Sequence, residues 1–377
     1  MPIANKKEIQ ITISEDCNLN CIYCYEKSKS HNVITEQKIK EIILKELASP
    51  GLKQIIIYFH GGEIALHFDI IKNTCEWVWK ENFETKVTFA ASTNGTLIQD
   101  DIKKWFELHS SDFQLGLSLD GTKEMHDINR NNSFDKIDLH FFKTQWPNQP
   151  VKMTISPLTI DKTAEGIIYI INQGFYVSAN LAYGCEWNNM ELKRAYAKEL
   201  TKLADFFISN PEIDLPRRPF CKNLELIGKY VVSNKPQRHI KWCGTGEFMV
   251  CYSPEGDKYP CQMFMPSSGN KKGGIPTIEN IQVSSLCNSC FILSICPSCY
   301  GYNYINTGIL SKAPDGLCDY TKLETLCYSY ILSTMLKDAN KYKHTRNMSD
   351  VSKALCIKGI KYVQETLLLE LSDYLKA

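Results

Sequence analysis

The 377-residue chain lacks any uninterrupted apolar stretch of the roughly 18 residues needed to span a bilayer. Its first ten residues, MPIANKKEIQ, also lack the apolar core of a secretory signal. No excess of charge of either sign is present, since 43 basic residues face 42 acidic ones, and this argues against nucleic acid or an anionic membrane as a partner. We therefore expect a cytoplasmic protein with neither kind of partner.

Cysteine, by contrast, is abundant, with 16 residues in the chain. Without an export signal, the disulfide framework of a small secreted protein is disfavoured. Many of the cysteines are separated by only two, three or five residues, and such short loops suit several ligands on one metal centre. The sequence therefore predicts metal or iron–sulfur ligation.

The first 185 residues alternate strand-like and helix-like segments. Strands of four to eight residues rich in β-branched and aromatic side chains are predicted at 8–14, 54–60, 86–92, 113–119, 151–156 and 176–182. Helices such as 36–48, with Thr35 as its N-cap, lie between them. This pattern predicts an α/β fold whose parallel sheet is doubly wound or curved into a partial barrel, with functional residues at the carboxyl ends of the strands.

Composition changes twice along the chain. Three prolines in residues 210–219 follow a predicted helix at 190–208, and residues 220–320 are rich in cysteine, glycine and proline with poor periodicity. Such a segment suits a small domain organised by metal. Helical periodicity then resumes and runs to the end. We predict domains at 1–215 and 216–330 and a C-terminal helical extension at 331–377.

Three cysteines follow the first predicted strand as C-x3-C-x2-C: Cys17, Cys21 and Cys24. Three thiolates on one loop can hold three irons of a [4Fe–4S] cluster and leave the fourth iron open. A structural zinc site is the alternative, and it would need a fourth ligand, for which His31 is the local candidate.

The motifs at the next strand ends resemble those of the radical S-adenosylmethionine (SAM) enzymes. They are HGGEI at 60–64, with Ile64 where the family usually has proline, STNG at 92–95, and SLDGTKEMHDINR at 118–130. The resemblance implies a partial (βα)6 TIM-like barrel in which the open iron binds SAM, whose reductive cleavage gives a hydrogen-abstracting 5′-deoxyadenosyl radical. It also implies contacts to the cluster or to SAM from Tyr23, Gly61, Gly62, Glu63, Ser92, Asn94, Ser118, Asp120 and Arg130.

The second field of cysteines resembles the SPASM domain of radical SAM enzymes that modify peptides and proteins. It matches that pattern except that Cys296 and Cys299 are separated by two residues rather than three. The resemblance implies one auxiliary [4Fe–4S] cluster on Cys287, Cys290, Cys296 and Cys318 and a second on Cys243, Cys261 and Cys299. Two zinc sites built as a ribbon are the alternative.

The fourth ligand of the second auxiliary cluster stays open. The family often has a cysteine at the position of Gln237, so Cys221, Cys251, substrate or an open iron could take its place. The remaining cysteines are interpreted as small buried apolar residues, with Cys185 set apart because it follows the sixth strand at the expected barrel mouth; they are Cys75, Cys185, Cys327 and Cys356.

The resemblance leaves the reaction less defined than the cofactors, which are SAM and three [4Fe–4S] clusters. In sulfatase maturases an aspartate general base follows the cysteine of G-x4-C, whereas this chain has Gln262, which cannot take a proton at neutral pH. No catalytic residue is therefore assigned. We expect a maturase that forms an oxidative crosslink (thioether, carbon–carbon or ether) in a ribosomally made peptide.

The alternatives are formylglycine formation as in sulfatase maturases, a small-molecule radical SAM dehydrogenase or epimerase, and a non-catalytic iron–sulfur or zinc protein. Expected partners are the precursor peptide and a reductant such as flavodoxin or ferredoxin. The first strand is expected seven residues from the start, which leaves no room for a fused leader-binding domain, so a separate leader-binding protein, the C-terminal helices or the barrel mouth would serve.

Overall fold

The computed structural model describes residues 5–81, 83–220, 222–235, 237, 243–270, 276, 278 and 285–375. The chain divides into two compact units. The first comprises Met1–Leu119, His126–Lys152 and Lys241–Ile281, and the second Asp120–Met125, Met153–Ile240 and Gln282–Ala377. The domain boundaries expected near residues 215 and 330 remain predictions. No helix in the described part of the chain is long and apolar enough to cross a membrane.

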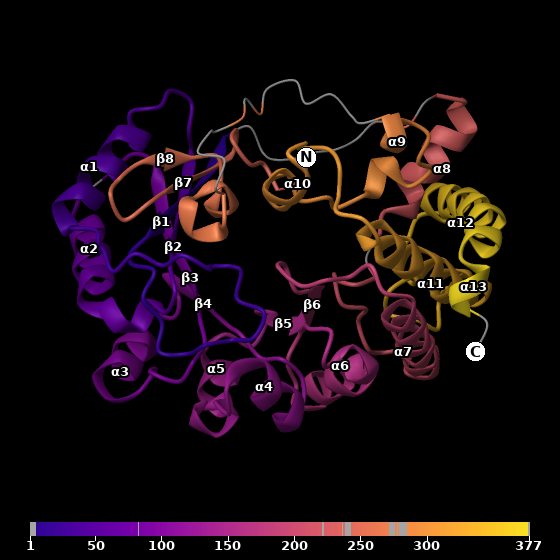
Figure 1. Ribbon diagram of the computed structural model, residues 1–377, viewed down its shortest axis with the longest axis horizontal. Coiled ribbons are helices and arrows are strands. Elements are labelled where there is room, and N and C mark those ends of the chain that lie inside the picture. The colour runs from indigo at the N-terminus through magenta and orange to yellow at the C-terminus, as the bar shows by residue number, and fades with distance from the viewer. Residues whose placement is uncertain are drawn as a thin grey trace. The chain divides into compact units, whose positions relative to one another are not determined.

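The first unit is built on a six-stranded sheet in the order β4-β3-β2-β1-β7-β8 (Figure 1). The neighbours from β4 to β7 pair in parallel, and β8 pairs with β7 in antiparallel fashion. The strands are β1 (Lys6–Thr12), β2 (Gln54–His60), β3 (Lys86–Thr93), β4 (Phe113–Leu117), β7 (Met249–Tyr252) and β8 (Lys258–Tyr259).

Buried apolar residues alternate with more polar residues along the strands, so one face of the sheet is apolar. In β1, Ile9 and Ile11 are fully buried, and they lie in register with Ile57 and Phe59 of β2. Phe59 stacks on Phe89 of β3 with ring centroids 5.9 Å apart. The opposite face carries polar residues, and this is the face that the candidate site uses.

Helices of the first unit connect the parallel strands. They are α1 (Glu36–Leu47), α2 (Phe68–Lys80), α3 (Asp100–His109) and α5 (Leu139–Gln145), with short 3₁₀ turns η1 (Ile64–His67), η2 (Phe134–Lys136), η4 (Gln262–Phe264) and η5 (Pro266–Ser268). The hydroxyl of Thr35 accepts from the Lys38 N–H, which confirms it as the N-cap of α1. Helix α4 (Lys123–Arg130) and strand β5 (Val151–Ile155) each have residues in both units.

The second unit contains the two-stranded sheet β5-β6 and most of the C-terminal helices (Figure 1). Its elements are β6 (Val177–Leu181), α6 (Thr163–Asn172), α7 (Met190–Ser209), α8 (Leu224–Ser233), α9 (Ser285–Asn288), α10 (Tyr300–Thr307), α11 (Leu317–Lys337), α12 (Asp350–Glu370), α13 (Ser372–Leu375), and the turns η3 (Ile160–Lys162) and η6 (Leu293–Ile295).

Two glycines allow α8 and α12 to cross closely. A Cβ at Gly228 would lie 1.9 Å from the Leu355 carbonyl oxygen, and one at Gly359 would lie 2.1 Å from that of Leu224. Helix α12 also packs against α11. The C-terminal helix therefore docks on the body of its unit, as its amphipathic sequence predicts.

The predicted α/β fold with a parallel sheet is confirmed, and the six predicted strands match β1–β6 to within two residues at each end. Two features differ from the prediction. Strands β5 and β6 form a separate sheet, and β7 joins the parallel sheet beside β1 although it lies in the segment expected to be organised by metal. Helix α8 also lies in that segment.

Candidate functional site

The candidate site lies at the carboxyl ends of β1, β2 and β3 in the first unit. The loop from β1 to α1 carries Cys17, Cys21 and Cys24, and its two ends are joined by the bridge between Ser14 and Val33. The segment after β2 carries the GGE motif, and the one after β3 carries STNG. Because parallel strands end at the same edge of a sheet, these three segments meet there.

Two glycines let the segment after β2 approach the cysteine loop. A Cβ at Gly61, whose φ is +147°, would lie 2.1 Å from the Ser14 carbonyl oxygen, and one at Gly62 would lie 2.2 Å from that of Asp16. The Gly62 N–H donates to the Ser14 oxygen (3.1 Å) and the Glu63 N–H donates to the Asp16 oxygen (2.8 Å). Both positions thus require glycine.

Glu63 connects the ends of β2 and β3. Its side chain is buried, and its carboxylate accepts from the Thr93 hydroxyl (2.7 Å), the Asn94 N–H (2.7 Å) and the Ala65 N–H (3.1 Å). Burial raises the pKa of Glu63, while these hydrogen bonds and the charge of Arg130 oppose the rise. The carboxylate therefore organises the strand ends.

Asn18, which the motif comparison did not single out, connects the cysteine loop to the STNG segment. Its amide donates to the Thr96 hydroxyl (2.9 Å), and its oxygen accepts from the Asn94 side chain (2.9 Å). The only sequence signal was an amide residue directly after Cys17. The structure thus brings the predicted CNLNC, GGE and STNG motifs together.

Of the remaining cofactor-binding candidates, Tyr23, Ser118 and Arg130 belong to the first unit. The guanidinium of Arg130, at the end of α4, lies 5.5 Å from the centre of the Tyr23 ring. The Ser118 N–H donates to the Thr93 carbonyl oxygen (3.0 Å), which holds the end of β4 beside β3. Asp120 belongs to the second unit, where its carboxylate accepts from the Thr154 N–H (2.8 Å).

Ser92 belongs to a polar cluster on the face of the sheet opposite to Ile9 and Ile11. The Lys152 ammonium donates to the Ser92 hydroxyl (2.7 Å) and to the Tyr58 hydroxyl (2.9 Å). His60 lies two residues after Tyr58, and its pKa is lowered to about 4 by burial and by the Lys152 charge. Sequence reasoning missed Lys152 because a lysine in a strand is ordinarily a solvated residue.

Several buried polar atoms of the first unit lack a hydrogen-bond partner among the described residues. They include the Nδ1 of His60 and the side-chain oxygens of Gln10 and Gln262. An unpaired buried polar atom costs about 1–3 kcal/mol, so native proteins usually supply a partner, which a ligand can provide. These atoms fit a site that binds a polar ligand.

The three cysteines of the β1 loop are half-buried. Burial raises the pKa of the Cys17 thiol, and the Cys24 N–H donates to the Cys21 carbonyl oxygen (3.0 Å). The zinc candidate His31 is instead exposed and bonds Asp16 through its Nδ1 (2.6 Å).

Within the described residues, no three His, Cys, Asp or Glu side chains gather around one metal-ion position. A zinc ion needs such convergence, whereas the thiolates of a [4Fe–4S] cluster each bind a different iron and lie further apart. The donor set of the cysteine loop, three thiols, fits a [4Fe–4S] cluster with one open iron.

In the second unit, the four cysteines predicted for one auxiliary cluster are neighbours. Burial raises the pKa of the Cys296 thiol to about 12, with further contributions from Cys318 and Cys290. Cys318 keeps exposed surface, yet burial around its sulfur raises the pKa of its thiol to about 11, and Cys287 and Cys290 add to the rise. A cavity of about 80 Å³ is lined by Cys296, Cys318 and also Cys299.

The second predicted set of auxiliary ligands is divided between the units, since Cys243 and Cys261 belong to the first and Cys299 to the second. The turn after Cys243 lies beside the residue that precedes Cys261, because the Thr245 hydroxyl donates to the Pro260 carbonyl oxygen (3.0 Å). This set remains a prediction.

Of the candidates for the fourth ligand, Cys221 lies outside the described residues. Cys251 is fully buried in β7, where its sulfur lies 3.6 Å from that of Met265 and 3.8 Å from the Thr12 hydroxyl. Gln237 forms hydrogen bonds to the 291–294 segment, where its side-chain oxygen accepts from the Ser294 hydroxyl (2.8 Å).

Comparison with known proteins agrees with this site. Residues 11–140 match the Radical SAM superfamily model. A cysteine-type anaerobic sulfatase-maturating enzyme of Clostridium novyi is 33% identical over 141 residues, which are 33% of this chain and 36% of that protein. The chain thus spans about a third of the length of this curated relative.

Two solved structures share the fold. The native sulfatase-maturating enzyme anSMEcpe with bound AdoMet has a TM-score of 0.65 at 19% identity and covers 86% of this chain and 96% of its own. Streptococcus suis SuiB bound to the precursor peptide SuiA has a TM-score of 0.56 at 17% identity, covering 84% and 76%.

The strand-end site and the family match define a radical SAM domain. This domain covers residues 11–140 of the chain, and the chain shares its fold with anSMEcpe and SuiB.

Proposed function

We propose that the protein is a radical SAM maturase that forms an oxidative crosslink in a ribosomally made peptide. The observation that carries the radical SAM part is the hydrogen-bonded junction of Glu63, Asn94 and Asn18, which joins the three strand-end motifs beside Cys17. When bound, a [4Fe–4S] cluster with SAM supplies the hydrogen-abstracting radical. Cys17, Cys21 and Cys24 would hold that cluster.

The protein's own residues have three roles in this proposal. The Gly61–Gly62 turn packs the GGE segment directly on the backbone of the cysteine loop at Ser14 and Asp16, which fixes the position of that loop. Arg130 supplies a fixed positive charge suited to a carboxylate. The polar face of the sheet, with Ser92 and Lys152, supplies hydrogen-bond donors for a polar substrate group.

Gln262 supports peptide crosslinking over formylglycine formation. Its side-chain oxygen is buried and lacks a hydrogen-bond partner among the described residues, and an amide can accept a hydrogen bond but cannot take up a proton at neutral pH. We infer that this oxygen receives a donor from the substrate. Formylglycine formation is the second candidate, favoured by the match to a sulfatase-maturating enzyme.

The first test is anaerobic reconstitution followed by addition of SAM and dithionite. Wild-type protein is expected to bind about twelve iron atoms per chain and to release 5′-deoxyadenosine. Cys24→Ala should abolish release, while Cys75→Ala, a buried cysteine of α2, should retain it. Full iron loading without 5′-deoxyadenosine would refute the radical SAM activity.

The second test separates the two candidate reactions. The protein is co-expressed with candidate precursor peptides from neighbouring reading frames, and separately with a peptide that carries a sulfatase-type cysteine. Loss of two hydrogens from a precursor, with the fragments still linked in tandem mass spectrometry, would support crosslinking. An aldehyde on the sulfatase-type peptide, detected by reaction with a hydrazide, would support formylglycine formation instead.

A further inference from the structure

A buried lysine, Lys222, and a half-buried lysine, Lys322, lie near the four neighbouring cysteines of the second unit. Lys322 lies on α11, one helical turn after Cys318, and its side chain is 17% exposed. Lys222 precedes α8, and its side chain is 6% exposed. A buried ammonium group is costly unless it is paired, so such a group near cysteines needs a reason.

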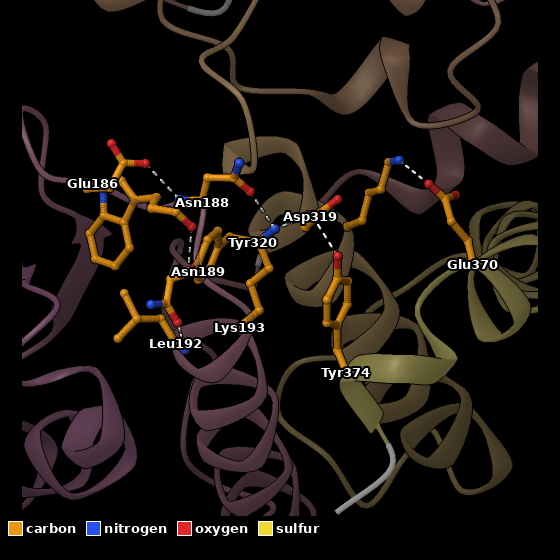
Figure 2. Close-up of polar contacts among 11 residues, drawn as sticks. Glu186, Asn188, Asn189, Leu192, Lys193, Asp319, Tyr320, Glu370 and Tyr374 are labelled. Carbon is orange, nitrogen blue, oxygen red and sulfur yellow. Dashed lines mark hydrogen bonds and ion pairs between the residues drawn. The ribbon is translucent and has the colours of Figure 1, made fainter.

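Each lysine is fixed by a glutamate. Lys322 pairs with Glu370 at the end of α12, which Figure 2 shows beside α11. Burial would lower the pKa of Lys322, but the hydrogen bond to Glu370 and the nearby negative charges, that of Glu370 first, together raise it. Lys322 is therefore a cation at neutral pH.

Lys222 pairs with Glu324 of α11 at 2.8 Å, and the Tyr196 hydroxyl donates to the other oxygen of that carboxylate (3.0 Å). Glu324 lines the same cavity as Cys296 and Cys318. The two ion pairs thus flank the cysteines from different elements.

The first turn of α11 is fixed by a further set of contacts next to Cys318. Asp319 pairs with Lys193 of α7 (2.8 Å) and accepts from the Tyr374 hydroxyl of α13 (2.9 Å), as Figure 2 shows. Lys322 therefore extends from a helix turn that α7 and α13 hold in place, and its ammonium keeps a defined position relative to Cys318.

Both lysines are placed beside the cysteines by the fold. Lys322 lies one helical turn after Cys318 on α11. Lys222 is held 2.8 Å from Glu324, which lines the cavity together with Cys296 and Cys318. The two ammonium groups are therefore close enough to affect the charge of a group held by these cysteines.

We propose that Lys322 and Lys222 are redox-tuning residues that raise the reduction potential of a [4Fe–4S] cluster held by Cys287, Cys290, Cys296 and Cys318. The potential of such a cluster depends on nearby charge, hydrogen bonding and exposure, and a fixed cation favours the reduced form, which carries one more negative charge. This inference rests on the proposed iron–sulfur enzyme. It assigns the auxiliary cluster the role of an electron acceptor.

The test is a potentiometric titration, followed by electron paramagnetic resonance, of the full-length reconstituted protein without SAM. The signal of this cluster is identified as the one lost in Cys318→Ala. When Lys322→Met is poised at the midpoint potential of the wild-type cluster, the ratio of oxidised to reduced cluster should be about tenfold higher than in wild type. For a one-electron couple this corresponds to a midpoint potential about 59 mV lower. Lys222→Met should shift the same midpoint in the same direction.

Glu370→Gln separates charge from structure. It breaks the same ion pair as Lys322→Met but removes a negative charge, so the midpoint should rise. Lys361→Met on α12 removes an equal charge from a pair whose side chains are 73% and 64% exposed, and it should leave the midpoint unchanged.

The proposal would be overturned if the midpoint potential shifts in the same direction in Lys322→Met and Glu370→Gln. It would also be overturned if neither shift is larger than that of the Lys361→Met control. If Lys322→Met fails to bind iron, Glu370→Gln decides, since an unchanged midpoint there overturns it as well. Unchanged iron content in Cys318→Ala would remove its basis. If the midpoint potentials shift as expected but no 5′-deoxyadenosine is released, the proposed function is refuted and the redox-tuning proposal is not.

Discussion

Replacing Glu63 by glutamine tests whether this carboxylate organises the strand ends. Its two oxygens accept from two backbone N–H groups, of Ala65 and Asn94, and from the Thr93 hydroxyl. A glutamine amide has one oxygen, and in either orientation its NH2 group faces one of the two buried N–H groups. One backbone donor therefore loses its acceptor.

The loss of that acceptor is expected to cost about 1–3 kcal/mol, and the remaining bonds lose the strengthening that an ionised acceptor gives. Because Asn94 also bonds Asn18 of the cysteine loop, the damage reaches the SAM site. We expect Glu63→Gln to lower the free energy of unfolding by this amount in urea titrations. Affinity for SAM, measured by equilibrium dialysis, should weaken about tenfold for each 1.4 kcal/mol transmitted to the site.

Thr93→Val is the comparison variant, because it leaves both N–H bonds to Glu63 in place while it removes the hydroxyl that donates to Glu63 and accepts from the Gly95 N–H (3.0 Å). It should cost about 1–3 kcal/mol and change SAM affinity less than Glu63→Gln does. If Glu63→Gln unfolds within about 0.5 kcal/mol of wild type and binds SAM normally, the carboxylate does not organise the site.

Three further changes test other parts of the first unit. Burial would raise the pKa of Glu46, but hydrogen bonds from lysines and a tyrosine outweigh this effect and hold the pKa at about 2, against 4.5 in the unfolded chain. The ionised carboxylate should therefore add up to about 3 kcal/mol to the free energy of unfolding above pH 5, and this contribution should be lost as the pH falls toward 2. Urea titrations of Glu46→Gln and wild-type apoprotein should converge over that pH range, and a constant difference would contradict the assignment. Gly62→Ala places a Cβ 2.2 Å from the Asp16 carbonyl oxygen, so the variant should lose iron from the SAM-binding cluster, measured as iron per chain, and full loading would contradict the close approach. Cys251→Ala should keep the iron content of wild type because its sulfur packs against that of Met265, whereas loss of about a third of the iron would make Cys251 a ligand.

Local patterns were enough to predict the strands and the motif positions. The strands are short and rich in β-branched and aromatic residues, so β1–β6 could be located closely. Motifs that follow successive parallel strands must meet at one edge of the sheet, and CNLNC, GGE and STNG do so. The capping role of Thr35 also depends only on nearby residues.

The rest depended on contacts between distant parts of the chain. β7 pairs with β1 across more than two hundred residues, and a four-residue strand in a cysteine-rich segment gives no periodic signal. The GGE motif predicted a ligand contact for Glu63, but the direction of its side chain toward Thr93 and Asn94 follows only from the three-dimensional arrangement. The partners of Lys322 and Lys152 were hidden for the same reason.

The two groups of cysteines differ in how nearby residues offset thiolate charge. At Cys17, the Lys29 cation is opposed by Glu63 and by Cys24, and the pKa of the thiol is raised by burial. In the second unit burial likewise raises the pKa of the Cys290 and Cys296 thiols, and the charges of Lys322 and Lys222 oppose that rise. A cluster beside the lysines should therefore have the higher reduction potential, since more positive charge favours the reduced form.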